Sequence, residues 1–133
     1  MRNKTVLLVD DEKPILEALG NYLERNEFVV KTAISGEAAL AHLCATPIDV
    51  VITDLVMDGM SGIDVLKEIK KINNEICVFI LTGQDDMALA IEALRSGADD
   101  FILKPCDADK LILQMQRFFA KQVTSKKKIK GLS

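Results

Sequence analysis

The sequence is poor in several features, and each shortage excludes a class of protein. No apolar run approaches the ~20 residues of a membrane span, so we expect no membrane insertion. The start of the chain leads directly into a strand pattern, and we expect no signal peptide. Only three cysteines are present, Cys44, Cys77 and Cys106, and their wide spacing forms no paired metal motif. This usage favours reduced thiols and a cytoplasmic location.

Positive charge is also scarce in most of the chain. Residues 121–133 contain five lysines and no acid, so residues 1–120 have a net charge of −8 although the whole chain has −3. An acidic body argues against direct nucleic-acid binding. We predict one domain over residues 1–121, followed by a basic tail or the start of a linker over residues 122–133.

Short runs of apolar, often β-branched residues alternate with helical patterns along the chain. The predicted strands are Thr5–Val9, Phe28–Ala33, Val50–Asp54, Ile76–Leu81 and Phe101–Leu103. Such runs, too short for helices, are typical of strands buried on both faces. The fivefold β–α alternation predicts an α/β fold with a single doubly wound five-stranded parallel sheet. Right-handed crossovers favour the strand order 2-1-3-4-5.

Polar side chains stand at the carboxyl ends of four of these strands. They are Asp10, Asp11 and Glu12 after the first strand, Asp54 at the third, Thr82 at the fourth and Lys104 at the fifth. In the predicted order these strand ends meet at one edge of the sheet, where open α/β sheets bind ligands. Crowded carboxylates repel one another unless a cation joins them, and hard oxygen ligands suit Mg²⁺.

This set of side chains suits phosphoryl chemistry. A metal-bridged aspartate can act as a nucleophile toward phosphorus and form an acyl phosphate. Lys104 and Thr82 are the right chemical types to stabilise phosphoryl oxygens. Each residue also has a structural interpretation: Asp10, Asp11 or Asp54 as a cap, Thr82 as a strand residue and Lys104 as a surface lysine. Their agreement at four strand ends favours the functional interpretation.

Four separated motifs resemble the receiver domain of bacterial two-component response regulators. They are Val9-Asp10-Asp11-Glu12, Asp54 at the end of the third strand, Thr82-Gly83 and Lys104-Pro105. The resemblance covers about residues 4–120. It implies a flavodoxin-like (βα)5 fold and a role in phosphorelay signal transduction.

The resemblance also implies a set of site residues. Asp54 would accept a phosphoryl group from the phosphohistidine of a sensor histidine kinase or a phosphotransfer protein. Asp10, Asp11, Asp54 and the backbone carbonyl of Val56 would hold Mg²⁺, with Mn²⁺ as a substitute. The resemblance thus describes a phosphoprotein that works with a divalent metal.

The remaining implied roles concern the response to phosphorylation. Lys104 would pair with the phosphoryl oxygens, Thr82 would hydrogen-bond them in the active state, and Phe101 would be the aromatic switch residue. The face formed by the fourth helix, fifth strand and fifth helix would then control a partner, a second copy of the domain or an output domain. Such a domain is regulatory, not an enzyme, beyond self-directed phosphotransfer and autodephosphorylation.

The chain departs from the family pattern at two positions near Asp54. Many members have a proline where this chain has Asp58, and although Asp58-Gly59 suits a turn, we expect a less stiff loop. Ser61 often corresponds to an acidic residue in the family, and here it serves equally as a helix cap. Neither departure involves a reacting atom. Val56 lies where the family varies the residue beside the phosphoryl group, and it offers no side chain to orient a hydrolytic water.

Three alternatives compete with this interpretation. A phosphatase of the haloacid dehalogenase type also uses a strand-end aspartate, but it needs a second acid where this chain has Val56. A flavin-binding module needs a Gly/Ser/Thr-rich loop after the first strand, where three acids would repel a phosphate. A receiver that docks partners without being phosphorylated would not need the intact set of site residues.

Overall fold

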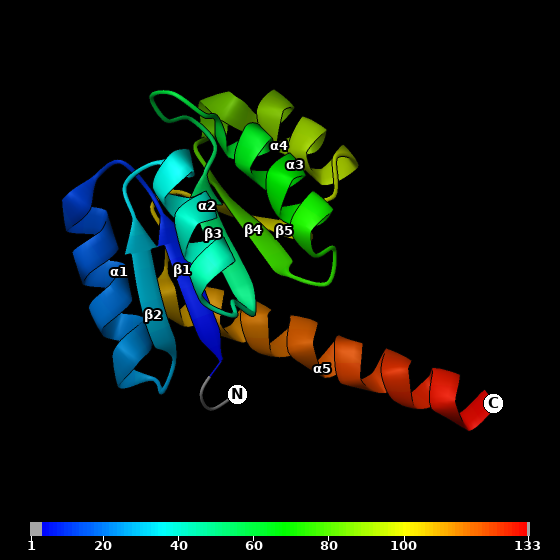
Figure 1. The fold of residues 1–133 in the computed structure, drawn as a ribbon. Helices are drawn as coiled ribbons and strands as arrows, with labels where there is room; N and C mark the ends of the chain where they lie inside the picture. Colours follow the sequence, from blue (N-terminus) through cyan, green and yellow to red (C-terminus); the bar gives the residue numbers. More distant parts are fainter. Residues whose placement is uncertain (1–3, 133) are drawn as a thin grey trace.

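The computed structural model describes the backbone of residues 4–132 and the side chains of residues 4–122. Within this range, strands and helices alternate along the chain (Figure 1). The strands are β1 (Thr5–Val9), β2 (Val29–Ala33), β3 (Val50–Asp54), β4 (Cys77–Thr82) and β5 (Asp100–Leu103). The helices are α1 (Lys13–Arg25), α2 (Gly36–Ala45), α3 (Gly62–Ile72), α4 (Met87–Arg95) and α5 (Ala108–Leu132).

The strands form one parallel sheet with the order β2-β1-β3-β4-β5, as predicted. β1 lies between β2 and β3, and its pairing with β3 places Val6 opposite Val50. β3 and β4 are buried along their whole lengths, which explains why both begin with a run of apolar residues. The predicted fold class and topology are therefore confirmed.

The two faces of the sheet are covered by different helices, and each has its own core. One core joins the sheet to α2, α3 and α4 through residues such as Ala39, Leu66 and Ala90. The other joins it to α1 and α5 through residues such as Leu23 and Met115. Both cores are built from buried apolar side chains, so the strands that carry the carboxyl edge of the sheet are packed on both faces.

The fourth helix follows a tighter turn and buries only small side chains. A 3-10 turn over Gln84–Asp86, labelled η1, precedes α4. The large apolar residues Leu89, Ile91 and Leu94 are 39%, 47% and 36% exposed, and Ala90 and Ala93 face the core instead. A helix with apolar residues on several sides does not reveal from its sequence which side is buried.

The last helix continues through the predicted basic tail. α5 runs to Leu132 as an unbroken helix, and its end extends past the other elements in Figure 1. The predicted boundary at residue 121 stays a prediction. In the described part of the chain, no helix combines the length and the apolar character needed to cross a bilayer.

Candidate functional site

Three of the predicted site residues meet at the carboxyl edge of the sheet. The Lys104 Nζ atom lies 3.0 Å from Asp54 Oδ2 and 3.9 Å from Asp10 Oδ2. Asp54 is 7% exposed and Asp10 only 1%. Asp11 is exposed at the rim, yet one carboxylate oxygen from each of Asp10, Asp11 and Asp54 lies within 4.8 Å of the others. The convergence that the strand order predicts is present.

The charges of these groups are strongly coupled. Burial raises the pKa of the Asp10 carboxyl, and the negative charge of Asp54 raises it further, against the backbone N–H of Glu12. Burial alone would lower the pKa of Lys104. The hydrogen bond to Asp54 and the charges of Asp54 and Asp10 outweigh that effect, so the pKa of Lys104 is raised. Lys104 is therefore charged at neutral pH and offsets the crowded carboxylates.

The donor set at this edge fits a divalent metal. Asp10 Oδ1 accepts a hydrogen bond of 3.0 Å from the Glu12 N–H. Its other oxygen, Oδ2, is buried and has no hydrogen-bond partner among the described residues. A buried carboxylate oxygen without a partner costs free energy, which a cation would recover. Three convergent carboxylates with this unmet demand are suitable ligands for Mg²⁺.

Two residues that we did not single out from the sequence hold Asp54 in place. The Thr53 hydroxyl donates to the Asp54 carbonyl over 3.0 Å. Gly62 lies against the same carbonyl, and a Cβ atom there would stand 2.3 Å from the Asp54 oxygen and 2.8 Å from Leu55 Cα. A glycine at the first position of a helix, right after a capping serine, is the sequence signal for such a close approach.

The loop between β3 and α3 contains Val56, whose side chain is 54% exposed. Gly59 adopts a left-handed φ of 78°, so the predicted Asp58-Gly59 turn is present. The loop ends at Ser61, which forms a reciprocal capping box with Asp64, as the sequence suggested. The capping box therefore holds the end of this loop where it enters α3.

The two predicted switch residues lie in the strands that precede and follow α4: Thr82 ends β4, and Phe101 lies in β5. The Thr82 hydroxyl is buried and bonds backbone carbonyls of its own loop, Gly83 at 3.2 Å and Asp86 at 3.5 Å. Phe101 is half-buried and packs against the core that contains Ala90 and Ala93 of α4. Both residues thus contact the segment that leads into or underlies α4.

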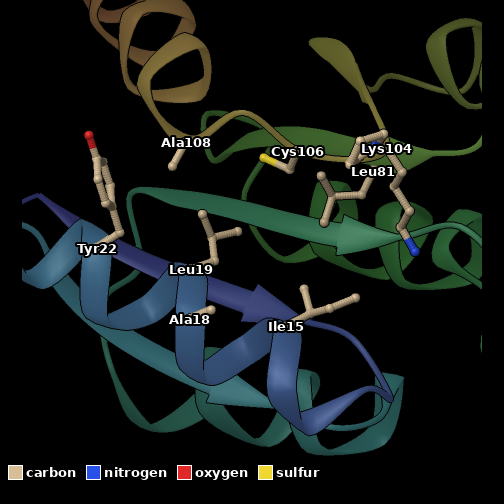
Figure 2. Close-up of a pocket in the computed structure, with 9 residues that line it drawn as sticks. Ile15, Ala18, Leu19, Tyr22, Leu81, Lys104, Cys106 and Ala108 are labelled. Atoms are coloured by element: carbon tan, nitrogen blue, oxygen red, sulfur yellow. The ribbon is translucent and has the colours of Figure 1, made fainter.

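An apolar cavity of about 360 Å³ adjoins the site between α1 and the β5–α5 connection. Figure 2 shows the ammonium end of Lys104 at one side of this cavity and the Tyr22 ring at the other. Ala18 and Leu19 of α1 line it between them, and the Tyr22 hydroxyl hydrogen-bonds Asp109 of α5. The site therefore has an apolar neighbour that spans two helices of the same face of the sheet.

Comparison with known proteins identifies the family of this chain. Residues 6–116 match the family model for the response regulator receiver domain. The chain belongs to the response regulator receiver family. The receiver fold, the strand order and the motif set predicted from the sequence agree with this assignment.

Curated relatives of this receiver domain include longer regulators. It is 38% identical over 117 residues to the transcriptional regulatory protein FixJ of Rhizobium meliloti, covering 88% of this chain and 57% of FixJ. It is 39% identical over 111 residues to a cyclic di-GMP phosphodiesterase of Thermotoga maritima, covering 84% of this chain and 30% of that protein. The chain thus spans only part of the length of these curated relatives.

Solved receiver structures have the same fold. A response regulator receiver domain protein from Clostridium thermocellum is 36% identical with a TM-score of 0.85, covering 91% of this chain and 98% of that chain. NtrX from Brucella abortus is 32% identical with a TM-score of 0.88, covering 98% of this chain and 30% of NtrX. The second match shows this receiver fold within a much longer protein.

Proposed function

We propose that this receiver domain accepts a phosphoryl group on Asp54 from the phosphohistidine of a sensor histidine kinase or phosphotransfer protein. Asp54 Oδ would attack phosphorus, the P–N bond to the imidazole would break, and an acyl phosphate would form. The supporting observation is the position of Asp54, at a strand end beside Lys104 and two further carboxylates.

The same edge supports a Mg²⁺ requirement. Asp10, Asp11, Asp54 and the backbone carbonyl of Val56 would hold the ion, with Mn²⁺ as a substitute. When bound, the ion supplies positive charge that offsets the negative charge of the phosphoryl group. The unpartnered Asp10 oxygen and the three convergent carboxylates support this assignment.

Lys104 and Thr82 would stabilise the transferred group. The Lys104 ammonium already contacts the Asp54 oxygen at 3.0 Å and would pair with a phosphoryl oxygen attached there. The Thr82 hydroxyl, bonded to its own loop, would turn toward the phosphoryl group. Phe101 would then turn into the space that this movement opens.

Phosphorylation would change the face formed by α4, β5 and α5. Leu89, Ile91 and Leu94 of α4 and Leu103 of β5 are large apolar side chains that these elements leave exposed. The partner of this face would be a second copy of the domain, a downstream protein or an output domain. The protein would act as a regulator in the cytoplasm, with self-directed phosphotransfer and autodephosphorylation as its only chemistry.

Labelling with a small phosphodonor tests the proposal. Incubation with acetyl phosphate and Mg²⁺ should add one phosphoryl mass to the intact protein, and chelation of Mg²⁺ should prevent it. Asp54→Asn should abolish the added mass. Asp58→Asn, an exposed acid in the same loop, is the matched control and should be labelled like the wild type. Equal labelling of the Asp54 variant would refute the assignment.

A further inference from the structure

The two ends of α4 are held very differently. At the carboxyl end, the Ala98 N–H donates to the Ala93 carbonyl over 3.0 Å, and the Asp99 N–H donates to the Val78 carbonyl over 2.8 Å. At the other end, no side-chain cap is present within the described segment Gly83–Met87, where η1 joins α4. Uncapped helix ends are weakly held, so the two ends of α4 differ in how readily they move.

A clamp formed by Lys70 and Asp99 fixes the carboxyl end. The Lys70 ammonium donates to the Ile76 carbonyl over 2.7 Å, to the Asn74 carbonyl over 3.3 Å and to Asp99 Oδ2 over 3.1 Å. Asp99 Oδ2 also accepts the Val78 N–H over 2.8 Å. The Lys70 side chain is only 18% exposed. One ion pair therefore ties the end of α3, the start of β4 and the α4–β5 connection together.

The body of α4 packs lightly. Within this fully described helix, the buried residues are two alanines, Ala90 and Ala93, which present little side-chain volume to the sheet. Sideways movement of α4 would therefore disturb few apolar contacts.

The Thr82 hydroxyl contacts the turn that leads into the amino end of α4. It bonds the carbonyl of Gly83, just before η1, and the carbonyl of Asp86, the last residue of η1. A hydroxyl that turns toward a phosphoryl group on Asp54 would give up these bonds. The amino end of α4 would then lose a hydrogen bond, while the carboxyl end would keep its hydrogen bonds and the Lys70–Asp99 ion pair.

We propose that Lys70 and Asp99 are positioning residues that form a fixed pivot, about which α4 swings when Thr82 releases its amino end. This inference rests on the proposed function, because the phosphoryl group is what draws Thr82 away. It specifies which end of α4 moves and which residues hold the other end.

Amide NMR with and without beryllofluoride and Mg²⁺ tests the pivot. In the wild type, chemical-shift changes should be large over residues 84–90 and at least threefold smaller over residues 95–99. Lys70→Met keeps the aliphatic stem but removes the ammonium. In this variant the changes should extend through residues 95–99, while beryllofluoride affinity stays within threefold of the wild type.

Two further variants separate the pivot from general effects. Lys71→Met removes the same charge one residue along α3, where the side chain bonds Glu68, and should keep the wild-type gradient. Asp99→Asn keeps an oxygen for the Val78 N–H but weakens the ion pair, so it should resemble Lys70→Met. It also serves if Lys70→Met fails the check of folding by circular dichroism.

The outcomes distinguish the pivot from the proposed function. Equal shifts at both ends of wild-type α4, or an unchanged gradient in both clamp variants, would overturn the pivot while leaving phosphorylation intact. Absence of beryllofluoride binding to the wild type would instead overturn the proposed function, and with it the pivot. Chemical-shift changes that are confined to the amino end of α4 in the wild type, and that reach the carboxyl end only in the clamp variants, would establish the pivot.

Discussion

Asp10 occupies the least favourable position of any side chain in the site. It is almost completely buried, and one of its oxygens has no hydrogen-bond partner among the described residues. Its nearest cation, the Lys104 ammonium, lies closer to Asp54 than to Asp10. A side chain in such a position reduces the stability of the metal-free fold. The same carboxylate that favours metal binding therefore lowers the stability of the protein without the metal.

Replacement of Asp10 by asparagine should therefore stabilise the metal-free protein. We expect the free energy of unfolding at pH 7 to rise by on the order of 1 kcal/mol, because an unpaired buried charge is removed. The folded-state pKa of Asp10 is raised, so the folded protein holds this proton more tightly than the unfolded chain. The gain should thus be full above the folded-state pKa and vanish as the pH falls below about 3.9, the ordinary aspartate value.

Urea unfolding with a chelator, repeated across pH, measures this effect. Asp58→Asn, an exposed acid, should change stability by less than about 0.5 kcal/mol at any pH. Saturating Mg²⁺ should stabilise the wild type more than the Asp10 variant, because the variant lacks one ligand. A destabilised Asp10→Asn protein at pH 7 would contradict the account.

Two glycines illustrate how the same change acts differently in two elements. Gly62→Ala in α3 would place a Cβ 2.3 Å from the Asp54 carbonyl oxygen, and backbone must move to admit it. We expect a loss of about 1–3 kcal/mol of stability and weaker Mg²⁺ binding, because the Asp54 loop shifts. Thermal unfolding and Mg²⁺ titration measure the two effects.

Gly20→Ala in α1 is the matched control for this substitution. Its Cβ would lie 3.5 Å from the nearest side-chain atom, in ordinary contact. A glycine inside a helix costs about 0.5–1 kcal/mol relative to alanine, so this variant should gain stability with Mg²⁺ affinity unchanged. Equal losses in both variants would show that the Asp54 contact is not what matters at Gly62.

The cavity between α1 and α5 offers a test of how the phosphodonor approaches. A phosphohistidine protein that reaches Asp54 must cover the surface beside Lys104, and Lys104 also lines the cavity. Ala18→Arg would fill the cavity with a charged side chain. We expect at least a tenfold slower transfer from a histidine kinase that labels the wild type, with acetyl phosphate labelling unchanged.

The same substitution at Ala41, exposed on α2, is the control and should leave both rates unchanged. Slower labelling of Ala18→Arg by acetyl phosphate as well would instead indicate a distorted site. Measured initial rates with the two donors therefore separate docking from chemistry.

At the scale of the whole molecule, the architecture could be predicted from the sequence more fully than the contacts between elements. Short apolar runs such as Val50–Ile52 are rich in β-branched residues and too short for a helix, which indicates a strand buried on both faces. The strand order then brought Asp10, Asp54 and Lys104 together without further information. The residue pattern alone could predict this convergence, since all strands of a parallel sheet run in one direction and their carboxyl ends meet at the same edge.

Contacts between elements were not predictable in the same way. The Lys70–Asp99 pair joins residues 29 positions apart, and neither belongs to a recognisable motif. The outward direction of Ile91 depends on two neighbouring alanines that fit closer to the sheet. Such features depend on the packing distance between elements, which a residue pattern does not contain.

The predicted domain boundary at residue 121 has a direct test. Among the side chains that the structure describes, the last one buried in the core is Phe119. Removal of residues 122–133 should therefore lower the free energy of unfolding by less than about 0.5 kcal/mol and leave acetyl phosphate labelling unchanged. Urea unfolding and intact mass provide the two measurements. Loss of cooperative unfolding would move the boundary beyond residue 121.

The pairing of β1 with β3 has a consequence for the time the chain needs to fold. Val6 meets Val50 across 44 residues of sequence, and no neighbouring strands in this parallel sheet are joined by a tight hairpin. Each strand pairing loses the entropy of closing a long loop before the contacts between the strands stabilise it. Substitutions in the β1–β3 pair should therefore slow refolding, whereas substitutions at the outer face of α4 should leave the refolding rate unchanged.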